Sequence, residues 1–479
     1  MNLPQEVRYR PYKDWTSEEM KALKEKVQKS PWHATYHIEP KTGLLNDPNG
    51  FSYFNGKYHL FYQNWPYGPA HGLKSWVHTE SDDLIHFEET GVILYPDTKN
   101  DSHGAYSGSA YPVDDKLFIF YTGNVRDENW IRDPLQIGAF MNQNREIEKF
   151  DDVLIKQPSD VTEHFRDPQI FSYKDNFYAI VGAQSLDKKG FIKLYQAVNN
   201  DIKNWHFIGD LDFDGKGSEY MIECPNLVFV DEHPVLLYSP QGLAKSELEY
   251  ENIYPNTYKI YQSFDINNCK LTQPSPIHNL DFGFEAYATQ AFNTPDGRAL
   301  AVSWIGLPDI DYPTDDYGYQ GAMSLVKELH FKNGKLYQKP VHAIKELRQT
   351  SKVFSNLENT NNVYELELTV PKQTITELVL FADDKENGLK LTIDTINGNV
   401  ILDRSNVGTP YAIEFGTTRH CTIDTTDTDL QIFVDKSIIE IFINEGEKVF
   451  TSRVFPNNDQ NGIKLQSGQA TGKYYELKL

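Results

Sequence analysis

Five short runs of apolar and aromatic residues recur along the first two thirds of the chain at a nearly constant interval. They begin at Lys57, Lys116, Asn176, Pro234 and Arg298, so the steps between them are 59, 60, 58 and 64 residues. Each run has the composition of a β-strand, and no helical pattern separates one from the next. A repeat of this length, with several strands per unit, is typical of the blades of a β-propeller. The sequence therefore predicts five blades, and the alternative is a two-sheet sandwich whose spacing is accidental.

The chain before the repeats has a different pattern. Residues 1–32 are expected to form a short helical extension, because Thr16 and Glu19 make a capping box and the apolar residues that follow keep helical spacing. Pro31 is expected to end the helix. Its apolar stripe indicates packing rather than a functional role.

The pattern changes again near residue 338. Residues 33–338 are assigned to the propeller, and residues 339–352 to a linker helix that Pro340 begins. Residues 353–479 alternate apolar and polar side chains with a period of two, which indicates half-buried antiparallel strands and a C-terminal β-sandwich. The predicted fold class is all-β.

Composition and charge narrow the class of function. Of the 479 residues, 39% are hydrophobic and 13% aromatic, which suits a globular, strand-rich protein with aromatic-lined grooves and argues against disorder. The net charge of −22 argues against nucleic acid and anionic membranes as partners.

Cysteine usage and hydropathy bear on location. Three widely spaced cysteines suggest reduced thiols, and neither a signal-peptide pattern nor a long apolar run is found in the sequence. We therefore expect a cytoplasmic protein. Its histidines have no metal-ligand spacing, so no metal and no cofactor are predicted; the oligomeric state is not readable.

A second set of positions keeps the same interval as the repeated strands. Asp47, Ser107, Asp167, Glu223 and Tyr287 stand 60, 60, 56 and 64 residues apart, each just before a repeated strand. Equivalent positions of a propeller are related by rotation about its axis, so these side chains are expected to meet at the central channel if they lie on the innermost strands. Three of the five are carboxylates. Carboxylates this close repel, so at least one is expected to hold its proton near neutral pH.

Such a group is what cleavage of a glycosidic bond needs. One ionised carboxylate faces the anomeric carbon, and a protonated acid stands at the leaving oxygen. For any single member, a turn-capping Asp or a surface Glu is the simpler interpretation. Three carboxylates at equivalent positions favour catalysis.

These motifs resemble those of glycoside hydrolase family 32, the invertases, sucrose-6-phosphate hydrolases and fructan hydrolases. The similarity runs from about residue 33 to the C-terminus in the family's order, and is greatest to intracellular bacterial members. It rests on Asn46-Asp47-Pro48-Asn49-Gly50, Tyr106-Ser107-Gly108-Ser109, Arg166-Asp167-Pro168, Glu223-Cys224-Pro225, Tyr287-Ala288, and the C-terminal runs 437–444 and 452–456.

The resemblance implies a role for each carboxylate. Asp47 would be the nucleophile, Glu223 the general acid and base, and Asp167 would bind fructose hydroxyls and stabilise the transition state. The implied reaction is the retaining release of terminal β-fructofuranosyl units from sucrose, sucrose 6-phosphate or short fructo-oligosaccharides, without a cofactor. The implied sugar-binding residues are Asn46, Gln63, Trp76, Tyr106, Ser107, Arg166, Tyr287 and Trp304.

Several alternatives remain open at this level. The aromatic residues could be ordinary core, Arg166 could pair with a neighbouring carboxylate, and the polar residues could satisfy turn or strand-end groups. A fructosyltransferase would share the three carboxylates. An inverting arabinan or xylan glycosidase and a non-catalytic sugar-binding propeller are further rivals. His71-Gly72, Tyr106 and Leu44-Leu45 depart from common family patterns, which bears on the leaving group, and Lys74 is the one basic residue we name for a 6-phosphate.

Overall fold

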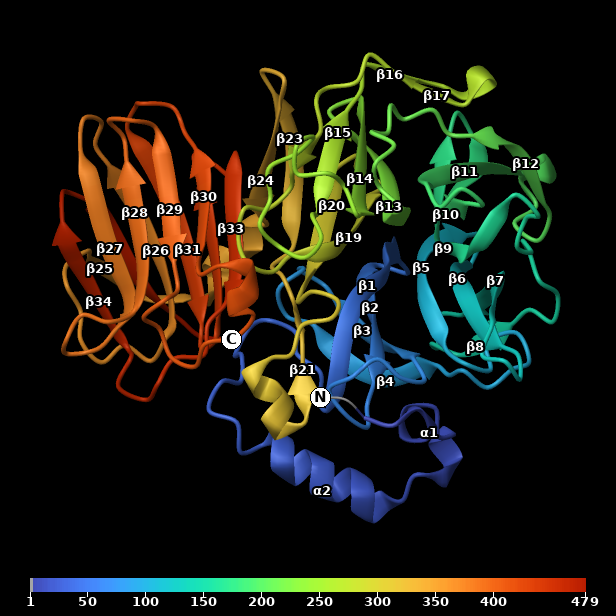
Figure 1. Ribbon diagram of the computed structural model, residues 1–479, viewed down its shortest axis with the longest axis horizontal. Coiled ribbons are helices and arrows are strands. Elements are labelled where there is room, and N and C mark those ends of the chain that lie inside the picture. The colour runs from blue at the N-terminus through green and yellow to red at the C-terminus, as the bar shows by residue number, and fades with distance from the viewer. Residues whose placement is uncertain (1–2) are drawn as a thin grey trace.

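The computed structural model describes residues 3–479, which form two strand-rich parts side by side (Figure 1). Strands of residues 43–340 make one part, and strands of residues 348–477 make the other, coloured orange to red in Figure 1. Helices are short, so the expected all-β class is confirmed. Among the described helices, none has the length and apolar character needed to cross a membrane.

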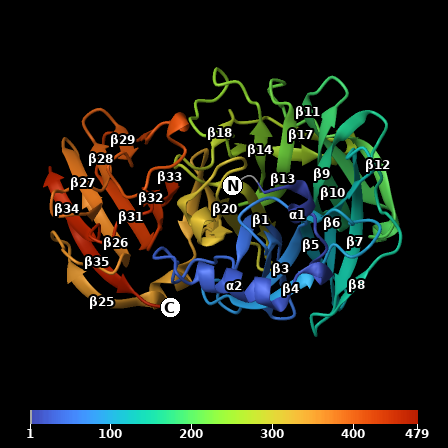
Figure 2. The ribbon, with the colours of Figure 1, turned by 60° about the horizontal axis from the view of Figure 1, so that its bottom comes forward.

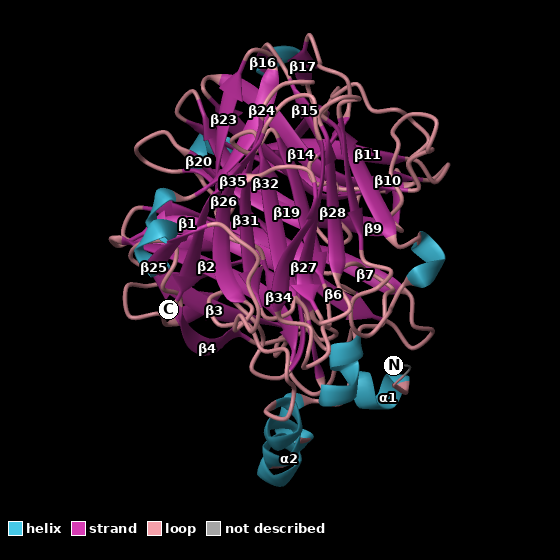
Figure 3. Ribbon diagram, turned by 90° about the vertical axis from the view of Figure 1, so that its left-hand side faces the viewer, coloured by secondary structure: helices cyan, strands magenta, loops and turns pink. Residues whose placement is uncertain are grey.

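The N-terminal segment carries the helices at one edge of the molecule (Figure 3). The expected capping box is present: the Thr16 hydroxyl accepts from the Glu19 amide at 3.2 Å, and the Glu19 carboxylate accepts from the Thr16 amide at 2.8 Å. The helix ends before Pro31, because the chain already turns after Gln28. The helical elements here are α1 (Gln5–Arg8), the 3-10 turn η1 (Tyr12–Asp14) and α2 (Ser17–Val27).

Within residues 3–479, five larger, mainly antiparallel sheets follow one another along the first part of the chain, with one two-stranded sheet beside them. The repeated strands of the sequence are the second strands β2, β6, β10, β14 and β20, and the phased positions lie on the first strands β1, β5, β9, β13 and β19. The first two sheets contain β1 (Gly43–Phe54), β2 (Lys57–Trp65), β3 (Ser75–Ser81) and β4 (Glu88–Leu94), then β5 (Ala105–Val113), β6 (Lys116–Arg126), β7 (Arg132–Met141) and β8 (Ile147–Lys149).

In the other three sheets the strands also follow one another from the first strand to the last. They contain β9 (Val161–Tyr173), β10 (Asn176–Ser185), β11 (Gly190–Ala197) and β12 (Trp205–Asp210); β13 (Met221–Val230), β14 (His233–Gln241), β15 (Thr257–Ile260) and β18 (His278–Asn279); and β19 (Tyr287–Asn293), β20 (Ala299–Ile305), β23 (Lys327–Lys332) and β24 (Lys335–Pro340), with β22 (Ala322–Met323) on β20. Small elements between them are η2 (Val198–Asn200), β16 (Ser263–Asp265), η3 (Ile266–Asn268), β17 (Lys270–Thr272), η4 (Pro313–Tyr317) and β21 (Tyr319–Gln320). Strand β21 returns to the first sheet, where it pairs in parallel with the start of β1.

Polar side chains join each first strand to the first strand of the next sheet, and the fifth back to the first. We call Asn49, Ser109, Gln169, Asn226 and Gln290 the polar belt. Their links are Asn49 Oδ1 with Gly108 N at 3.1 Å, Ser109 Oγ with Pro168 O and Ile170 N at 2.9 Å, Gln169 Oε1 with Leu227 N at 2.8 Å, Asn226 Oδ1 with Ala291 N at 3.4 Å, and Gln290 Oε1 with Phe51 N at 2.8 Å. The belt lies two or three residues after the phased positions, so it holds those positions at one level.

The C-terminal part is two antiparallel sheets that enclose a hydrophobic core, seen at the left in Figure 2. The expected alternation is present in β26 and β28, whereas β32 is buried along its whole length, because its outer face packs on the first part of the chain. One sheet contains β25 (Arg348–Val353), β35 (Thr471–Leu477), β26 (Val363–Val370), β31 (Thr428–Asp435), β32 (Ile438–Ile443) and β33 (Lys448–Arg453). The other contains β30 (Thr418–Thr422), β29 (Asn399–Asp403), β28 (Leu389–Asp394), β27 (Ile375–Ala382) and β34 (Gly462–Ser467), with η6 (Ile413–Phe415) before β30.

The linker differs from the expected helix. Pro340 does not begin a helix but is the last residue of β24, opposite Lys327. Because β24 is an edge strand, a residue without an N–H group is tolerated there. The helical part is the short 3-10 helix η5 (His342–Leu347), and β25 follows directly.

A buried ionic group joins the two parts. The His37 imidazole lies 2.9 Å from Asp435 Oδ2 and 3.0 Å from Glu440 Oε1, and Lys327 lies 3.4 Å from Glu440. Burial alone would lower the pKa of His37, but the two carboxylates overcome that effect and raise it to about 9. The first part therefore meets the second through a protonated imidazole held between two carboxylates.

Candidate active site

The three phased carboxylates meet in one pocket. Asp47 comes from β1, Asp167 from β9 and Glu223 from β13. The Cys224 thiol lies between two of them, 3.7 Å from Asp47 Oδ2 and 3.5 Å from Asp167 Oδ2, and the Cys224 amide donates to Asp167 at 2.9 Å. Cys224 is thus in direct contact with Asp167, which stands 57 positions earlier in the chain, and with Asp47, which stands 177 positions earlier.

Each first strand has a β-bulge where it reaches the pocket. At these places two residues of the first strand stand opposite one residue of the second, which turns the side chains away from the sheet faces. At three of the bulges a non-glycine residue has positive φ: Asp167 (66°), Cys224 (47°) and Ala288 (51°). The bulges lie between residues 45 and 48, 105 and 108, 166 and 169, 223 and 226, and 287 and 290.

Asp47 is held by donors on both carboxylate oxygens. The Ser107 hydroxyl donates to Oδ2 at 2.6 Å, and the Asn46 amide donates to Oδ1 at 3.2 Å. Gln63 connects the two donors, because it binds the Ser107 hydroxyl and accepts from Asn46 at 3.3 Å. Burial and nearby Glu223 raise the pKa of Asp47, while the bonds from Ser107 and Asn46 lower it. The four polar residues expected around β1 and β5 therefore form one connected group.

Lys74 is part of the same group. Its ammonium donates to the Asn46 side chain, and only 2% of the residue is exposed. Burial lowers the pKa of Lys74 to about 7, although Asp47 favours its charged form. Lys74 thus lies beside Asp47 rather than projecting free toward a more distant subsite.

Asp167 is a buried carboxyl with a raised pKa. Its amide donates to the Thr122 hydroxyl at 3.0 Å, and its carboxyl accepts from the Cys224 amide. Burial, with the charges of Glu223 and Asp47, raises the pKa of Asp167 to about 7, although Arg166 opposes the shift. Sequence reasoning missed Thr122, yet it stands six residues into its repeated strand, as Gln63 does in the first.

Glu223 is bound on both oxygens by protein donors. Arg166 donates to Oε1 from Nη2 at 2.6 Å and from Nε at 3.2 Å, and Tyr287 donates to Oε2 at 2.5 Å. Arg166 also contacts His164 Nδ1 at 2.9 Å. The alternative reading of Arg166 as an ion-pair partner is therefore realised, and its partner is itself one of the three carboxylates. No sequence pattern pointed to His164.

The remaining aromatic residues differ in how close they come to this group. The Trp304 ring lies 6.3 Å from that of Tyr287, and its indole N–H is buried without a hydrogen-bond partner among the described residues. Trp76 is fully buried between Phe61 and Tyr121, and its indole donates to the Tyr106 carbonyl at 2.9 Å. Trp76 thus packs as core and supports the backbone of Tyr106 from behind.

A cleft beside Trp304 brings the N-terminal segment to the site. Its wall includes His71, whose ring lies 6.4 Å from Trp304, and Arg8, whose guanidinium donates to the His71 carbonyl at 2.9 Å. The Leu73 amide donates to the Arg8 carbonyl at 2.8 Å, which holds this segment on the loop before β3. The helical extension was expected to serve packing only, and it also lines this cleft.

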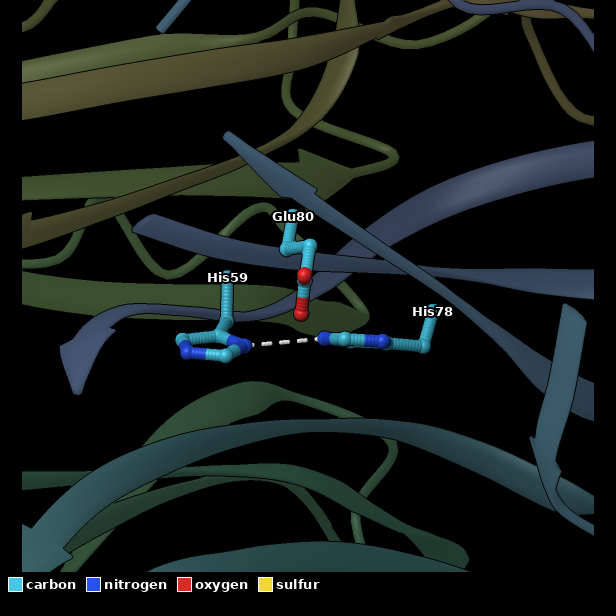
Figure 4. Close-up of side chains that lie close together, drawn as sticks. All are labelled: His59, His78 and Glu80. Atoms are coloured by element: carbon cyan, nitrogen blue, oxygen red, sulfur yellow. Dashed lines mark hydrogen bonds between the residues drawn. The ribbon is translucent and has the colours of Figure 1, made fainter. Parts of the chain in front are cut away.

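A second group of titratable residues lies outside the pocket, between β2 and β3 (Figure 4). His59 Nδ1 and His78 Nε2 are 2.9 Å apart, close to Glu80. His59 Nε2 must donate to the Phe54 carbonyl at 3.0 Å, so His59 Nδ1 accepts from His78. His78 Nδ1 then accepts from a threonine hydroxyl at 2.7 Å. Burial lowers the pKa of both histidines, to about 3 for His78, so two neutral rings form a satisfied hydrogen-bond chain.

Three neighbouring carboxylates, of which Asp47 and Asp167 have raised pKa values, lie among hydroxyl, amide and aromatic side chains and define the class of this protein as a glycoside hydrolase. Comparison with known proteins places it further. The model of the glycosyl hydrolases family 32 N-terminal domain matches residues 37–340, and that of the family 32 C-terminal domain matches residues 334–479. The chain belongs to glycosyl hydrolase family 32, and so has an N-terminal β-propeller domain and a C-terminal β-sandwich domain.

Relatives in this family match over their full length. The chain is 69% identical to the sucrose-6-phosphate hydrolase of Streptococcus mutans over 478 residues, with 100% of each chain covered. It is 49% identical to the enzyme of the same name from Lactococcus lactis, with 98% of each covered. Among solved structures, sucrose-6-phosphate hydrolase from Lactobacillus gasseri has a TM-score of 0.97 at 44% identity, covering 100% of this chain and 99% of that one. A variant β-fructofuranosidase from Bombyx mori in complex with sucrose has a TM-score of 0.83 at 30% identity, covering 96% and 97%.

Proposed function

We propose that this protein is a retaining β-fructofuranosidase that hydrolyses sucrose 6-phosphate and sucrose. The observation that carries the proposal is the proximity of Asp47 and Glu223, from different sheets of a family 32 fold, which is close enough for Glu223 to raise the pKa of Asp47. The names of the relatives support the phosphorylated substrate, and the sucrose complex of the Bombyx mori enzyme supports sucrose. Short fructo-oligosaccharides share the fructosyl end and are substrates of the same class.

In the first step Asp47 attacks the anomeric carbon of the fructosyl unit. Donors from Ser107 and Asn46 stabilise its ionised form and aim it. Glu223 gives a proton to the oxygen of the departing glucosyl unit, so a covalent fructosyl–Asp47 ester forms as the glycosidic bond breaks. Arg166 and Tyr287 fix the plane of the Glu223 carboxyl for this transfer.

In the second step Glu223 takes a proton from water, and the resulting hydroxide attacks the same carbon and releases Asp47. Fructose therefore leaves with the configuration of the substrate. Asp167 binds fructose hydroxyls and stabilises the charge of the oxocarbenium-like transition state. Burial raises the pKa of Asp167 to about 7, so its carboxyl is protonated for part of the time near neutral pH. Acid catalysis requires a proton on Glu223.

The domain assignment belongs to the same proposal. We assign the five sheets to five blades of one propeller, supported by the polar belt, which links each first strand to the next. Residues 1–32 are the extension and residues 33–338 the propeller. The family model that ends at residue 340 supports this boundary. We place the sandwich from residue 348 rather than 353, since β25 pairs with β35.

Product analysis tests this function. The purified protein is incubated with sucrose and with sucrose 6-phosphate, and the first products are followed by NMR. We expect fructose with glucose or glucose 6-phosphate, and β-fructofuranose as the first anomer. An α-anomer formed first would contradict retention, and growth of longer fructosides instead of free fructose would identify a transferase. Absence of turnover with both substrates would contradict the proposal as a whole.

A further inference from the structure

Two arginines face each other without a compensating charge at one end of the second sheet. Arg126 on β6 and Arg132 on β7 are direct cross-strand partners. Like charges in this arrangement destabilise a sheet. Neither guanidinium takes part in a salt bridge within residues 3–479, and the Nε atoms of both are buried without a hydrogen-bond partner. The fold therefore keeps two positive charges together and does not neutralise them itself.

The surroundings of the pair leave its hydrogen-bond donors unused. The one side-chain bond that either arginine makes within the described chain runs from Arg126 Nη1 to the Trp130 carbonyl at 2.9 Å. Asp127, in the adjacent turn, forms no salt bridge with either arginine within residues 3–479; its Oδ1 accepts from the amides of Asn129 and Ile131 at 2.9 and 2.8 Å. A chain with a net charge of −22 thus has an unpaired cationic spot beside an acidic turn.

This spot lies next to the proposed active site, on the side of Glu223. The Arg132 guanidinium is 5.5 Å from the centre of the Tyr106 ring, a residue expected at the sugar. His164, which contacts Arg166 at 2.9 Å, has its pKa lowered to about 4 by burial and by the charges of Arg166 and Arg132. Arg166 in turn holds Glu223. A path of neighbouring groups therefore runs from the acid that protonates the leaving oxygen to Arg132.

The side chains around Arg126 and Arg132 are of the kinds that bind a sugar phosphate. The Arg126 guanidinium lies 5.2 Å from the centre of the Trp130 ring. The Trp130 and Tyr9 rings are nearly perpendicular, with their centres 4.9 Å apart. Aromatic faces accept the C–H faces of a sugar, while guanidinium groups offer paired N–H donors that match phosphate oxygens. A phosphate dianion between the two arginines would also remove their mutual repulsion.

We propose that Arg126 and Arg132 bind the 6-phosphate of the glucosyl unit of sucrose 6-phosphate and set the preference for the phosphorylated substrate. This inference rests on the proposed function and deepens it. Lys74, the residue considered for this role from the sequence, lies beside Asp47, where the fructosyl unit is attacked, and not beside Glu223. The phosphate enters no covalent step; it is held while the glycosidic bond is broken.

Kinetic discrimination between two substrates tests the inference. The variants are Arg132→Gln and Arg126→Gln, and the measured quantity is kcat/KM for sucrose 6-phosphate divided by kcat/KM for sucrose. Loss of hydrogen bonds to a charged group predicts that this ratio falls about 10- to 100-fold in each variant. Arg132→Lys keeps the charge but not the paired donors, so an intermediate ratio is expected. Arg145→Gln is the matched control, because Arg145 lies in the turn at the other end of β7 and pairs with Glu80; its ratio should match the wild type.

A binding measurement separates recognition from turnover. Glucose 6-phosphate should raise the thermal unfolding temperature of the wild type more than glucose does, and this difference should disappear in Arg132→Gln. Without ligand, Arg132→Gln should be at least as stable as the wild type, because it relieves a like-charge contact. If both substrates are turned over by the wild type and the ratio in the two variants equals that of Arg145→Gln, the inference is wrong while the proposed function stands. If the wild type turns over neither substrate, the proposed function is wrong.

Discussion

Arg166 donates two hydrogen bonds to Oε1 of Glu223, from Nη2 at 2.6 Å and from Nε at 3.2 Å. Tyr287 donates to the other oxygen, so the Glu223 carboxyl is held in one plane from both sides. Asp47 is held in a comparable way by Ser107 and Asn46. Both groups that must face the glycosidic bond are therefore oriented before substrate arrives, which is the arrangement that makes positioning effective in catalysis.

The hydroxyl of Tyr287 should matter through Glu223. In Tyr287→Phe the ring remains and one charge-assisted hydrogen bond is lost, so kcat/KM for sucrose should fall about 10- to 100-fold. Steady-state kinetics measure the effect. Tyr254→Phe is the matched control, since the Tyr254 ring lies 6.2 Å from Tyr287 but its hydroxyl is bonded to Tyr220. Equal kinetics in the two variants would show that the bond to Glu223 has no catalytic role.

Replacement of the nucleophile should abolish turnover without unfolding the protein. Asp47→Asn keeps the size of the side chain and an oxygen that can accept from Ser107, but it cannot form the fructosyl ester. We expect kcat to fall by about 10⁴-fold or more. Sucrose hydrolysis and the thermal unfolding temperature are measured together, with the exposed Asp97→Asn as control. Turnover at an undiminished rate in Asp47→Asn would exclude Asp47 as the nucleophile.

The raised pKa of Asp167 should make the fold less stable as the pH rises toward neutrality and above. Its pKa is raised from the ordinary 3.8 to about 7 in the native state, so between these values the native protein binds a proton that the unfolded chain releases. Stability therefore declines as pH rises through this window, and this decline is absent in Asp167→Asn. The variant should gain about 2 kcal/mol over the wild type between pH 5 and pH 8, while losing most activity.

Chemical unfolding of both proteins at the two pH values measures this gain. The Cys224 amide can still bond to an asparagine oxygen, so the backbone at the bulge is retained in the variant. Asp187→Asn, an exposed change in the turn between β10 and β11, is the control. A stability difference between Asp167→Asn and the wild type that stays constant with pH would contradict the raised pKa.

His37 should stabilise the contact between propeller and sandwich below about pH 9. Its pKa is raised from 6.5 to about 9, so the stabilisation is complete below pH 6.5 and is lost as pH rises through 9. His37→Gln leaves Asp435 buried without a cation and Glu440 with Lys327 alone, and should cost about 3 kcal/mol at pH 6. Denaturant unfolding at pH 6 and pH 9.5 measures the cost, which should shrink at the higher pH. His86→Gln, an exposed histidine beside Asp83, should show no such cost, and an equal effect in both variants would refute the assignment.

Much of the fold could be predicted because its units are local. Each repeated strand has its own apolar pattern, and its interval to the next strand is visible in the sequence. The helix after Thr16 was predicted from its capping box for the same reason. The linker was not, because Pro340 is as compatible with an edge strand as with a helix start, and its pairing with Lys327 is a tertiary contact.

The sequence predicted which carboxylates would lie close together, but not how the strands and neighbouring side chains orient them. Asp47, Asp167 and Glu223 share one phase of the repeat, so their meeting follows from the symmetry of the fold. The β-bulges that orient these carboxylates cannot be recognised in the sequence, because one inserted residue per strand hardly changes the interval between repeats. The full burial of Trp76 was likewise decided only by packing.

The sequence by itself thus determined the repeated strands, the level at which the carboxylates stand and the family to which the chain is similar. Tertiary structure alone decided that Arg166 binds Glu223, 57 residues away, and that Arg126 stands opposite Arg132 with no acid between them. The reason is physical: strand patterns depend on neighbours one and two residues apart, whereas charge pairing depends on which distant side chains the packing of the sheets brings within a few ångströms.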